Sequence, residues 1–315
     1  MSLSINDASK LMQAVRDNIS LVIHGKEDKL QLVVLALVSG GHILIEDIPG
    51  VGKTTLARAI SKTVDGEFNR IQFTPDLLPT DITGNNIFDK DTNAFIFKKG
   101  PIFANILLGD EINRASPRTQ SALLEAMSEE QVTVDGESHY LPQPFIVIAT
   151  QNPIDYHGTY PLPEAQLDRF MLQIDLGYPP ENKEKALLIS RTSADPVDSI
   201  SSVLSLDDFK LLRELVDKVK IEESISDYLL KIVLETRLHR QLRLGVSTRG
   251  TLLYGRIVRA RAIMNGRDYV IPEDVKELAT YVLSHRILLD TKAQYGGIAR
   301  SSIIADIISA IKVPR

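Results

Sequence analysis

The feature that most constrains how this chain can fold is a series of short aliphatic runs in its first half. Helical or polar stretches separate the runs, which are residues 42–46, 70–73, 105–110, 145–150 and 171–175. Within each run the apolar residues are consecutive rather than alternating, which indicates strands buried on both faces. The sequence therefore predicts an α/β fold built on a five-stranded parallel sheet covered by helices.

The pattern changes after Gly177, where Tyr178-Pro179-Pro180 interrupts it, because each proline fixes its own φ and restricts the residue before it. We place a domain boundary here, between residues 1–178 and an all-α second domain at 179–315. Ser205 and Ser224 are predicted N-caps in this second domain, and Pro272 fits the first turn of a helix. Helix-period segments lie near residues 206–220, 224–241, 249–265 and 272–286.

The composition excludes several classes of protein. The 315 residues include no cysteine, which rules out disulfides, cysteine-bound metals and thiol nucleophiles and favours a reducing cytoplasm. A formal charge of -5 gives no general reason to expect binding to nucleic acid or to a membrane surface. The longest helical apolar run, Leu32 to Val38, is far shorter than the ~20 residues that cross a bilayer. We expect a soluble cytoplasmic protein with no membrane insertion and no removed segment. Its six histidines have no ligand spacing, so no separate metal site is expected.

A candidate phosphate-binding loop lies between the first aliphatic run and a helical stretch. Its residues are Asp47, Ile48, Pro49, Gly50, Val51, Gly52, Lys53, Thr54 and Thr55. In such loops backbone amides and a helix N-terminus surround the phosphates of a nucleotide, the lysine reaches the terminal phosphates and the threonine holds Mg²⁺. The strict pattern has glycine where this chain has Asp47, so the match rests on Gly50 and on Gly52-Lys53-Thr54. An ordinary loop is the alternative, but the place between strand and helix favours nucleotide binding.

Polar side chains next to the later runs complete a candidate hydrolysis site. Asp110 and Glu111 end the third run, and we assign Asp110 to Mg²⁺ and Glu111 to the attacking water. Asn152, after the fourth run, is a candidate for holding that water or sensing the γ-phosphate, and Arg169, before the fifth, is a candidate arginine finger. Each has a structural alternative: the acids as a helix cap, Asn152 as a turn residue before Pro153, and Arg169 as a surface ion pair.

Two segments of the first half stand apart from the alternation of strands and helices. Residues 74–100 are rich in turn-forming and polar residues before a short apolar Phe95 to Phe97, which indicates an excursion from the core. Residues 131–141 contain two β-like runs around Asp135-Gly136, a strong hairpin signal because type I′ turns need positive φ at both central residues. Ordinary surface loops explain both segments equally well.

Several long strings of the chain resemble MoxR-type AAA+ ATPases, and the resemblance covers essentially the whole sequence. The strings are the phosphate loop, RIQFTPDLLPTDITG at 70–84, GDEINRA at 109–115, TQSALLEAM at 119–127 and ATQNPIDYHGTYPLPEAQLDRF at 149–170. The resemblance implies a nucleotide-binding α/β domain with a helical lid, usually assembled as a hexameric ring that uses ATP/ADP and Mg²⁺. It makes Lys53 and Thr54 the Walker A ligands, and Asp110 and Glu111 the Walker B pair.

The resemblance also assigns roles outside these two motifs. Asn152 matches the sensor 1 position and Arg169 the arginine finger. Gly245-Val246-Ser247-Thr248-Arg249 resembles the sensor 2 motif, so Arg249 is expected to reach the γ-phosphate from the lid. His24-Gly25-Lys26 stands where the family lines the adenine and where relatives often carry valine-glycine-glutamine. The excursion at about 74–100 corresponds to the family's helix-2 insert, and residues 130–143 correspond to its pre-sensor hairpin.

Three functions of different classes are compatible with these residues. The first is an ATP-hydrolysing remodelling machine, similar to MoxR chaperones that act on client proteins, often ones with von Willebrand A-type domains and sometimes for metal or cofactor insertion. The second is a DNA translocase or helicase-like motor, which the acidic hairpin tip Asp135-Gly136-Glu137 disfavours because contact with the phosphate backbone needs lysine or arginine. The third is a nucleotide-gated binding module with negligible turnover, against which Glu111 and Arg169 argue.

The basic residues are unevenly distributed along the chain. Residues 237–267 contain eight arginines and neither a lysine nor an acid. One interpretation is a solvated helix face whose arginine stems cover apolar surface. The other is that Arg249 and Arg256, two turns further on, contribute positive potential toward ATP, while other arginines meet the acidic face of a neighbouring subunit.

Overall fold

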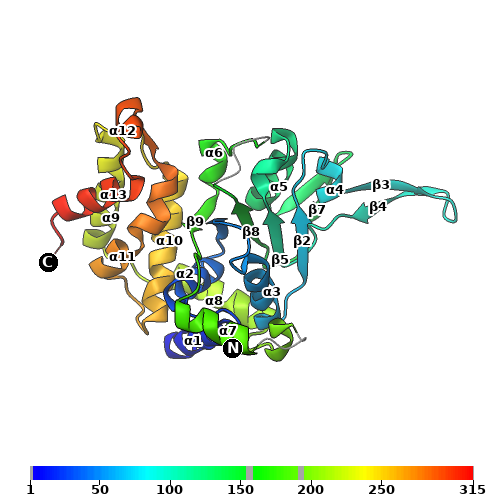
Figure 1. The fold of residues 1–315 in the computed structure, drawn as a ribbon, viewed down its shortest axis with the longest axis horizontal. Helices are drawn as coiled ribbons and strands as arrows, with labels where there is room; N and C mark the ends of the chain where they lie inside the picture. The colour runs from blue at the N-terminus through cyan, green and yellow to red at the C-terminus, as the bar shows by residue number, and fades with distance from the viewer. Residues whose placement is uncertain (1–2, 154–158, 191–194, 315) are drawn as a thin grey trace.

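The first half of the chain forms the predicted parallel sheet in the computed structural model, which describes residues 3–153, 159–190 and 195–314 (Figure 1). The strand order is β2-β5-β8-β1-β9, and every neighbouring pair is parallel. The strands are β1 (His42–Glu46), β2 (Phe68–Gln72), β5 (Ile106–Asp110), β8 (Ile146–Gln151) and β9 (Phe170–Ile174). The five-stranded sheet is confirmed.

Helices cover both faces of the sheet. Successive strand residues point to opposite sides, so a run of consecutive aliphatic residues places apolar side chains on both faces. Ile43 and Ile45 belong to a core shared with α1 (Ile5–Ser20), α2 (Glu27–Val38) and α3 (Lys53–Thr63). Leu44, between them, belongs to a second core with α5 (Pro117–Glu129). Burial on both faces explains why the aliphatic residues of each strand are consecutive.

The second half is helical, and its helices α10 and α11 contact the edge strand β9 (Figure 1). The helices are α6 (Glu164–Leu167), which precedes β9, and then α7 (Glu181–Ser190), α8 (Leu206–Lys218), α9 (Glu223–Leu238), α10 (Thr248–Met264), α11 (Pro272–Leu283), α12 (Thr291–Tyr295) and α13 (Arg300–Ala310). Short 3-10 turns are η1 (Ile112–Arg114), η2 (Pro196–Ser199) and η3 (Ser284–Arg286). A small antiparallel sheet joins β10 (Leu242–Leu244) to β11 (Leu288–Leu289).

Two of the three predicted helix starts are confirmed. Ser205 caps α8, because its hydroxyl accepts a hydrogen bond from the Asp208 N–H over 3.1 Å, and Pro272 is the first residue of α11. The predicted cap at Ser224 is wrong. The carbonyl of Glu222 accepts from the Ile225 and Ser226 amides, so α9 already begins at Glu223.

A continuous apolar core joins the two halves. The cluster that contains Ile43 also contains Tyr254 of α10 and Val275 of α11. The Ser9 hydroxyl of α1 donates to Met264 O at the end of α10 over 2.8 Å. The N-terminal helices therefore pack against the lid as well as against the sheet, and the division at residues 178 and 179 stays a prediction.

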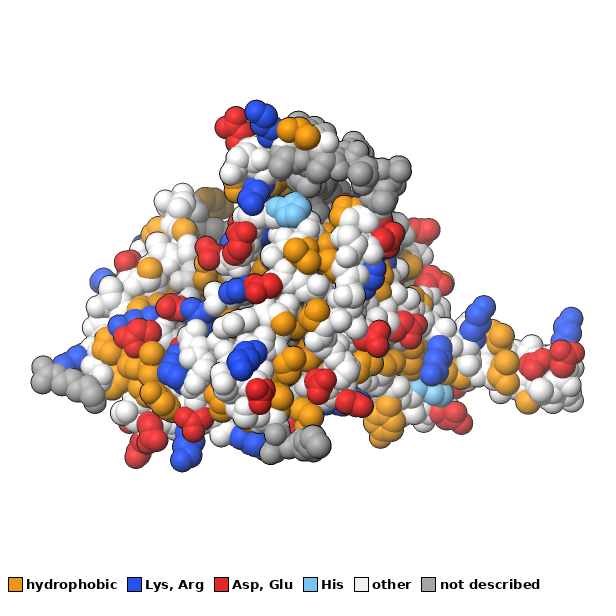
Figure 2. Space-filling model, turned by 90° about the horizontal axis from the view of Figure 1, so that it is seen from below, with side chains coloured by type: hydrophobic (Ala, Val, Ile, Leu, Met, Phe, Trp, Pro, Cys, Tyr) orange, Lys and Arg blue, Asp and Glu red, His pale blue; other side chains and the backbone are white. Residues whose placement is uncertain are grey.

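The two inserted segments are hairpins. The first contains α4 (Pro79–Thr83), β3 (Gly84–Asp89) and β4 (Ala94–Lys99), and its two strands form an arm that extends from the body (Figures 1 and 2). The second pairs β6 (Gln131–Val134) with β7 (Glu137–Tyr140). Asp135 and Gly136 have φ of 51° and 86°, as the type I′ prediction requires. The hairpins touch, since the Phe97 ring stacks on His139 with centroids 3.8 Å apart.

Within residues 3–153, 159–190 and 195–314, no helix is both long and apolar enough to cross a bilayer.

His42, at the start of β1, is buried with both ring nitrogens hydrogen-bonded. Nε2 donates to Met127 O over 3.0 Å, and Nδ1 accepts from the Val147 N–H over 3.0 Å. This pattern requires a neutral ring, and burial lowers the pKa of His42 to about 4. His42 thus fixes the start of β1 to both α5 and β8.

Acid should destabilise the fold through this histidine. Between its ordinary pKa of 6.5 and its folded value of about 4, the unfolded chain binds a proton that the folded chain excludes. The stability contributed by neutral His42 is therefore complete above pH 6.5 and is lost as the pH falls through this window. His42→Asn keeps an acceptor for the Val147 N–H in its Oδ1 but has no titrating ring. When the pH falls from about 7.5 to 4.5, we expect the free energy of unfolding of the wild type to decrease by about 2 kcal/mol more than that of the variant. Urea unfolding at both pH values measures the difference, and equal losses would contradict the assignment.

Candidate functional site

The predicted phosphate loop connects β1 to α3 at the carboxyl edge of the sheet. Gly50 and Gly52 have φ of 85° and 92°, in the left-handed region that favours glycine. Lys53 begins α3, followed by Thr54 and Thr55 in its first turn, so the amides of a helix N-terminus point toward the loop. The Lys53 Nζ donates to Asp47 O over 2.7 Å. The strand, loop and helix thus have the order that nucleotide binding requires.

Asp47, where the strict pattern has glycine, is a structural link. Its carboxylate is buried and accepts three backbone hydrogen bonds: from the Ile48 N–H over 2.8 Å, the Leu176 N–H over 2.7 Å and the Gly177 N–H over 2.6 Å. Leu176 and Gly177 follow β9 and lead into the second half of the chain. The Asp47 side chain therefore ties the phosphate loop to this exit from the sheet.

Asp110 and Glu111 lie at the same edge, at the end of β5. The Thr150 hydroxyl donates to Asp110 Oδ1 over 2.6 Å and accepts from the Glu111 N–H over 2.9 Å. Glu111 has φ of 56°, a left-handed conformation uncommon for this residue type. Thr150, on the neighbouring strand β8, thus sets the position of both acids.

Two side chains of β2 also hold the acids. Arg70 donates to Asp110 Oδ2 over 2.6 Å, and Gln72 donates to Glu111 Oε2 over 2.9 Å. Arg114 donates to the same Glu111 oxygen over 2.9 Å. The sequence analysis missed Arg70, Gln72 and Thr150 as site residues. The only signal for the first two was the pair of polar residues around Ile71, which gives β2 one polar face.

The charges at this edge suit a nucleotide with a divalent cation. Burial lowers the pKa of Lys53, and the nearby carboxylates of Asp110, Asp47 and Glu111 oppose that shift. Each Asp110 oxygen has one hydrogen bond to protein, so each keeps a lone pair for a water bound to Mg²⁺. Across the described residues, no group of three or more His, Asp or Glu side chains could hold a metal by itself. The donor set of Thr54 and Asp110 therefore fits a cation that phosphates and waters also bind.

Asn152 and the turn at His24-Gly25 lie next to this loop. Asn152 is buried directly after β8, and the Asp47 N–H donates to Gln151 O over 3.1 Å, which places the end of β8 beside the loop. A Cβ on Gly52 would lie 3.9 Å from Ile23, and one on Gly25 only 2.7 Å from Pro180. The His24-Gly25 turn is therefore packed between the phosphate loop and Pro180, which lies in the segment that leads into the second half of the chain. Part of the ATQNPIDYHGTYPLPEAQLDRF string, residues 154–158, lies outside the described residues.

Arg169 lies at the opposite edge of the sheet. It precedes Phe170, the first residue of β9, which pairs with His42, the first residue of β1. Its guanidinium donates to Leu124 O and, over 2.6 Å, to the Ser128 hydroxyl, near the end of α5. Because the phosphate loop follows the last residue of β1, roughly 13 Å of strand separates the two edges. Among the residues that the structure describes, no carboxylate forms an ion pair with Arg169, so the alternative of a surface ion pair is not supported.

Arg249 lies with Arg169 rather than with Lys53. It follows Ser247, the N-cap of α10, and lines a cavity of about 660 Å³ together with Asp168 and Arg286. Burial, and then the positive charge of Arg249, lower the pKa of Arg169. The lid thus places Arg249 beside the start of β9, and the expectation that Arg249 reaches the γ-phosphate stays a prediction.

Comparisons with known proteins match this architecture. The family model for the ATPase family associated with various cellular activities (AAA) matches residues 42–172, and the model for an AAA lid domain matches 234–307. The chain is 39% identical to chaperone MoxR1 of Mycobacterium tuberculosis over 93% of its own length and 80% of that protein. It is 47% identical to the uncharacterized protein YeaC of Bacillus subtilis over 98% and 96% of the two chains. The crystal structure of a candidate ATPase from Cytophaga hutchinsonii has a TM-score of 0.91 and 38% identity, with coverage of 99% of this chain and 97% of that one.

These matches decide the family. The chain belongs to the MoxR family of AAA+ ATPases. In this MoxR-family chain the AAA match includes Lys53, Asp110 and Glu111 at one edge of the sheet and Arg169 at the other edge. The lid match contains Arg249. The segment between the matches begins with β9 residues and includes Leu176 and Gly177, the partners of Asp47.

The Asp47 link should contribute to the stability of the MoxR-family chain. In Asp47→Asn an NH₂ group replaces one carboxylate oxygen. This group is a donor, so it cannot accept a hydrogen bond from the backbone N–H groups that it faces. We expect a loss of about 2 kcal/mol in the free energy of unfolding. Urea unfolding at neutral pH measures it. The matched control is Asp91→Asn on the exposed arm, which should change stability by less than about 0.5 kcal/mol. Equal stability of the two variants would contradict a structural role for Asp47.

Proposed function

We propose that this chain is a magnesium-dependent, ATP-hydrolysing chaperone of the cytoplasm whose catalytic sites form between neighbouring copies in a ring. The observation that carries the proposal is the separation of two groups on opposite edges of one sheet. Lys53, Asp110 and Glu111 surround the phosphate loop, whereas Arg169 and Arg249 lie together at the other edge. Each group lacks what the other supplies for ATP hydrolysis.

The carboxyl-edge group would bind ATP and prepare the water. The loop amides and Lys53 hold the phosphates, for which Lys53 gives up its hydrogen bond to Asp47 O. Thr54 and Asp110 would hold Mg²⁺, which would supply positive charge against the phosphates. Glu111 accepts a proton from the attacking water once its carboxylate is free of Gln72 and Arg114, and Asn152 orients that water.

The amino-edge group would complete the site of the next copy. Arg169 and Arg249 offer two guanidinium groups to the charge that develops on the γ-phosphate. Contacts of this head-to-tail kind use two different surfaces of each copy and close into a ring when the rotation permits. We propose six copies, the number implied by the resemblance to AAA+ ATPases.

We propose client proteins, including ones with von Willebrand A-type domains, as the targets of this machine. Support comes from the β3–β4 arm, on which Phe88 is 51% and Phe95 72% exposed. Exposed aromatic side chains of this kind suit apolar protein surface. The adjoining hairpin tip, Asp135 and Glu137, is acidic and repels nucleic acid. Metal or cofactor insertion into clients is a role that this arrangement permits, with the metal bound by the client.

Glu111→Gln should separate binding from hydrolysis. The amide keeps the size of the side chain and its neighbours but cannot take a proton, so we expect turnover to fall by about 100-fold or more with ATP affinity unchanged. Steady-state phosphate release and equilibrium binding of a fluorescent ATP analogue measure the two quantities. Wild-type turnover in the variant would remove Glu111 from the mechanism.

Mixing two inactive variants tests whether the site is shared. Lys53→Ala loses the phosphate-binding lysine but keeps both arginines, whereas Arg169→Ala keeps the loop and loses one arginine. Alone, we expect Arg169→Ala to lose activity by about 1000-fold. In an equal mixture about one quarter of the interfaces pair an intact loop with intact arginines, so about one quarter of the wild-type rate should return. An inactive mixture would refute sites shared between copies.

A further inference from the structure

We propose that Asp168 is the positioning residue that holds Arg169 and Arg249 in one fixed unit, with Ser247 and Arg286 as its partners. The inference rests on the proposed function, because it concerns how the amino-edge arginines are presented to a neighbouring nucleotide. Asp168 belongs to the α/β half, whereas Ser247 and Arg286 belong to the lid. A single carboxylate thus spans the junction between the two halves.

The contacts of Asp168 link the two segments that carry Arg169 and Arg249. Asp168 Oδ2 accepts from the Ser247 hydroxyl over 2.7 Å, and Asp168 Oδ1 lies 3.2 Å from Arg286 Nε. Arg169 follows Asp168 directly in the chain. The Ser247 hydroxyl also accepts from the Gly250 N–H over 3.0 Å, so the hydroxyl bound to Asp168 is the one that caps α10 and sets the turn carrying Arg249.

Arg286 is the buried anchor of this arrangement. Its side chain is 1% exposed, and its guanidinium donates to the carbonyls of Phe170 and Val282 and, over 3.3 Å, to that of Met171. Burial lowers the pKa of Arg286 to about 10, and the Asp168 carboxylate opposes that shift. Asp168 is its only ion-pair partner among the described residues. Without Asp168 the structure would hold a buried cation with no counter-charge, which is costly.

Electrostatics adds a second reason for a carboxylate here. Arg169 and Arg249 carry like charges close enough for one to lower the pKa of the other, and Arg286 adds a third positive charge beside them. Like charges repel and would splay these side chains apart in the absence of a neighbour of opposite sign. Asp168 supplies that charge from within 3.2 Å of Arg286, and it leaves Arg249 exposed for another ligand.

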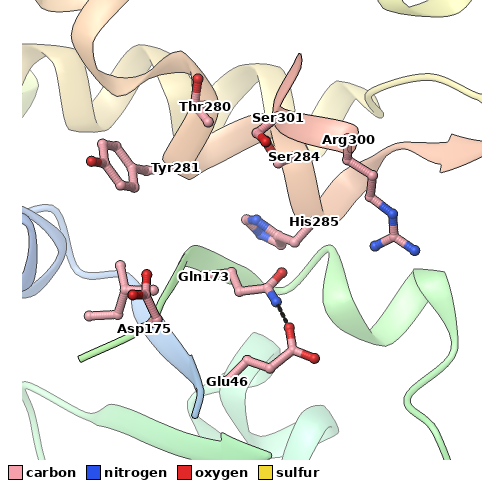
Figure 3. Close-up of a pocket in the computed structure, with 10 residues that line it drawn as sticks. Glu46, Gln173, Asp175, Thr280, Tyr281, Ser284, His285, Arg300 and Ser301 are labelled. Atoms are coloured by element: carbon pink, nitrogen blue, oxygen red, sulfur yellow. Dashed lines mark hydrogen bonds between the residues drawn. The ribbon is translucent and has the colours of Figure 1, made fainter. Parts of the chain in front are cut away.

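The other flank of the η3 turn shows where the polar contacts between the lid and the sheet lie. There a cavity of about 420 Å³ separates lid residues such as Arg300 from Gln173 and Glu46 of the sheet (Figure 3). His285 crosses the junction, and its Nε2 lies 3.0 Å from Phe170 O. The polar contacts of η3 with the sheet therefore concentrate at residues 168–171, immediately beside Arg169.

Asp168→Asn tests the inference. We expect it to bind a fluorescent ATP analogue as tightly as the wild type, because the phosphate loop lies at the other edge, but to lose about 10- to 100-fold in turnover as the arginines shift. Mixed with Lys53→Ala, it should recover the same fraction of activity as the Arg169→Ala mixture does. Glu164→Gln is the matched control. It removes an acid that lines the same cavity but forms no ion pair among the described residues, and it should keep wild-type turnover.

The outcomes separate the inference from the proposed function. If the Arg169→Ala mixture recovers activity and the Asp168→Asn mixture does not, Asp168 has a general structural role and the inference is wrong, while the shared site stands. Wild-type turnover of Asp168→Asn also overturns the inference. If the Arg169→Ala mixture itself stays inactive, the shared site falls and the inference with it. Ser247→Ala, which removes two hydrogen bonds, one to Asp168 and one from the Gly250 N–H, but no charge, should show a smaller loss of about 2- to 5-fold with the same recovery on mixing. No loss, or a loss without recovery, would count against the inference.

Discussion

The common direction of the strands is the constraint on which the rest of the molecule depends. In a parallel sheet every strand ends at the same edge, so Lys53, Asp110 and Asn152 converge although they are far apart in sequence. The same geometry sends Arg169, which precedes a strand, to the opposite edge. The sheet therefore holds Arg169 of one chain away from its own phosphate loop. The proposed assembly of copies would use this polarity.

Strand β9 connects the two edges to the lid through one carboxylate at each end. At its carboxyl end Asp47 accepts from the amides of Leu176 and Gly177, next to the phosphate loop. At its amino end Asp168 holds Ser247 and Arg286 of the lid, next to Arg169. In the proposed function, phosphates that draw Lys53 away from Asp47 O would act next to the first contact, and a neighbouring nucleotide would act next to the second. Strand β9 is the element that the two contacts share.

The sequence predicted what local patterns determine and missed what tertiary contacts determine. Consecutive aliphatic residues, the Asp135-Gly136 turn and the cap at Ser205 are local signals, and the structure confirms each of them. Arg70, Gln72 and Thr150 could not be found in this way, because their contacts with Asp110 and Glu111 depend on the register between strands. The place of Arg249 beside Arg169 likewise depends on how the lid packs against β9, which its motif does not specify.

The arginines of the segment at 237–267 include some that form ion pairs and some that do not. Arg256, Arg261 and Arg267 form ion pairs with Asp217, Glu277 and Asp274, so the suggestion that Arg256 acts with Arg249 toward ATP is not supported. Arg243 and Arg249 line one cavity and have no ion-pair partner within the described part of the chain. Acids outside the segment thus neutralise Arg256, Arg261 and Arg267. Arg237, Arg243 and Arg249 line the cavity beside Asp168, which concentrates positive charge on the face that a neighbouring triphosphate would meet in the proposed assembly.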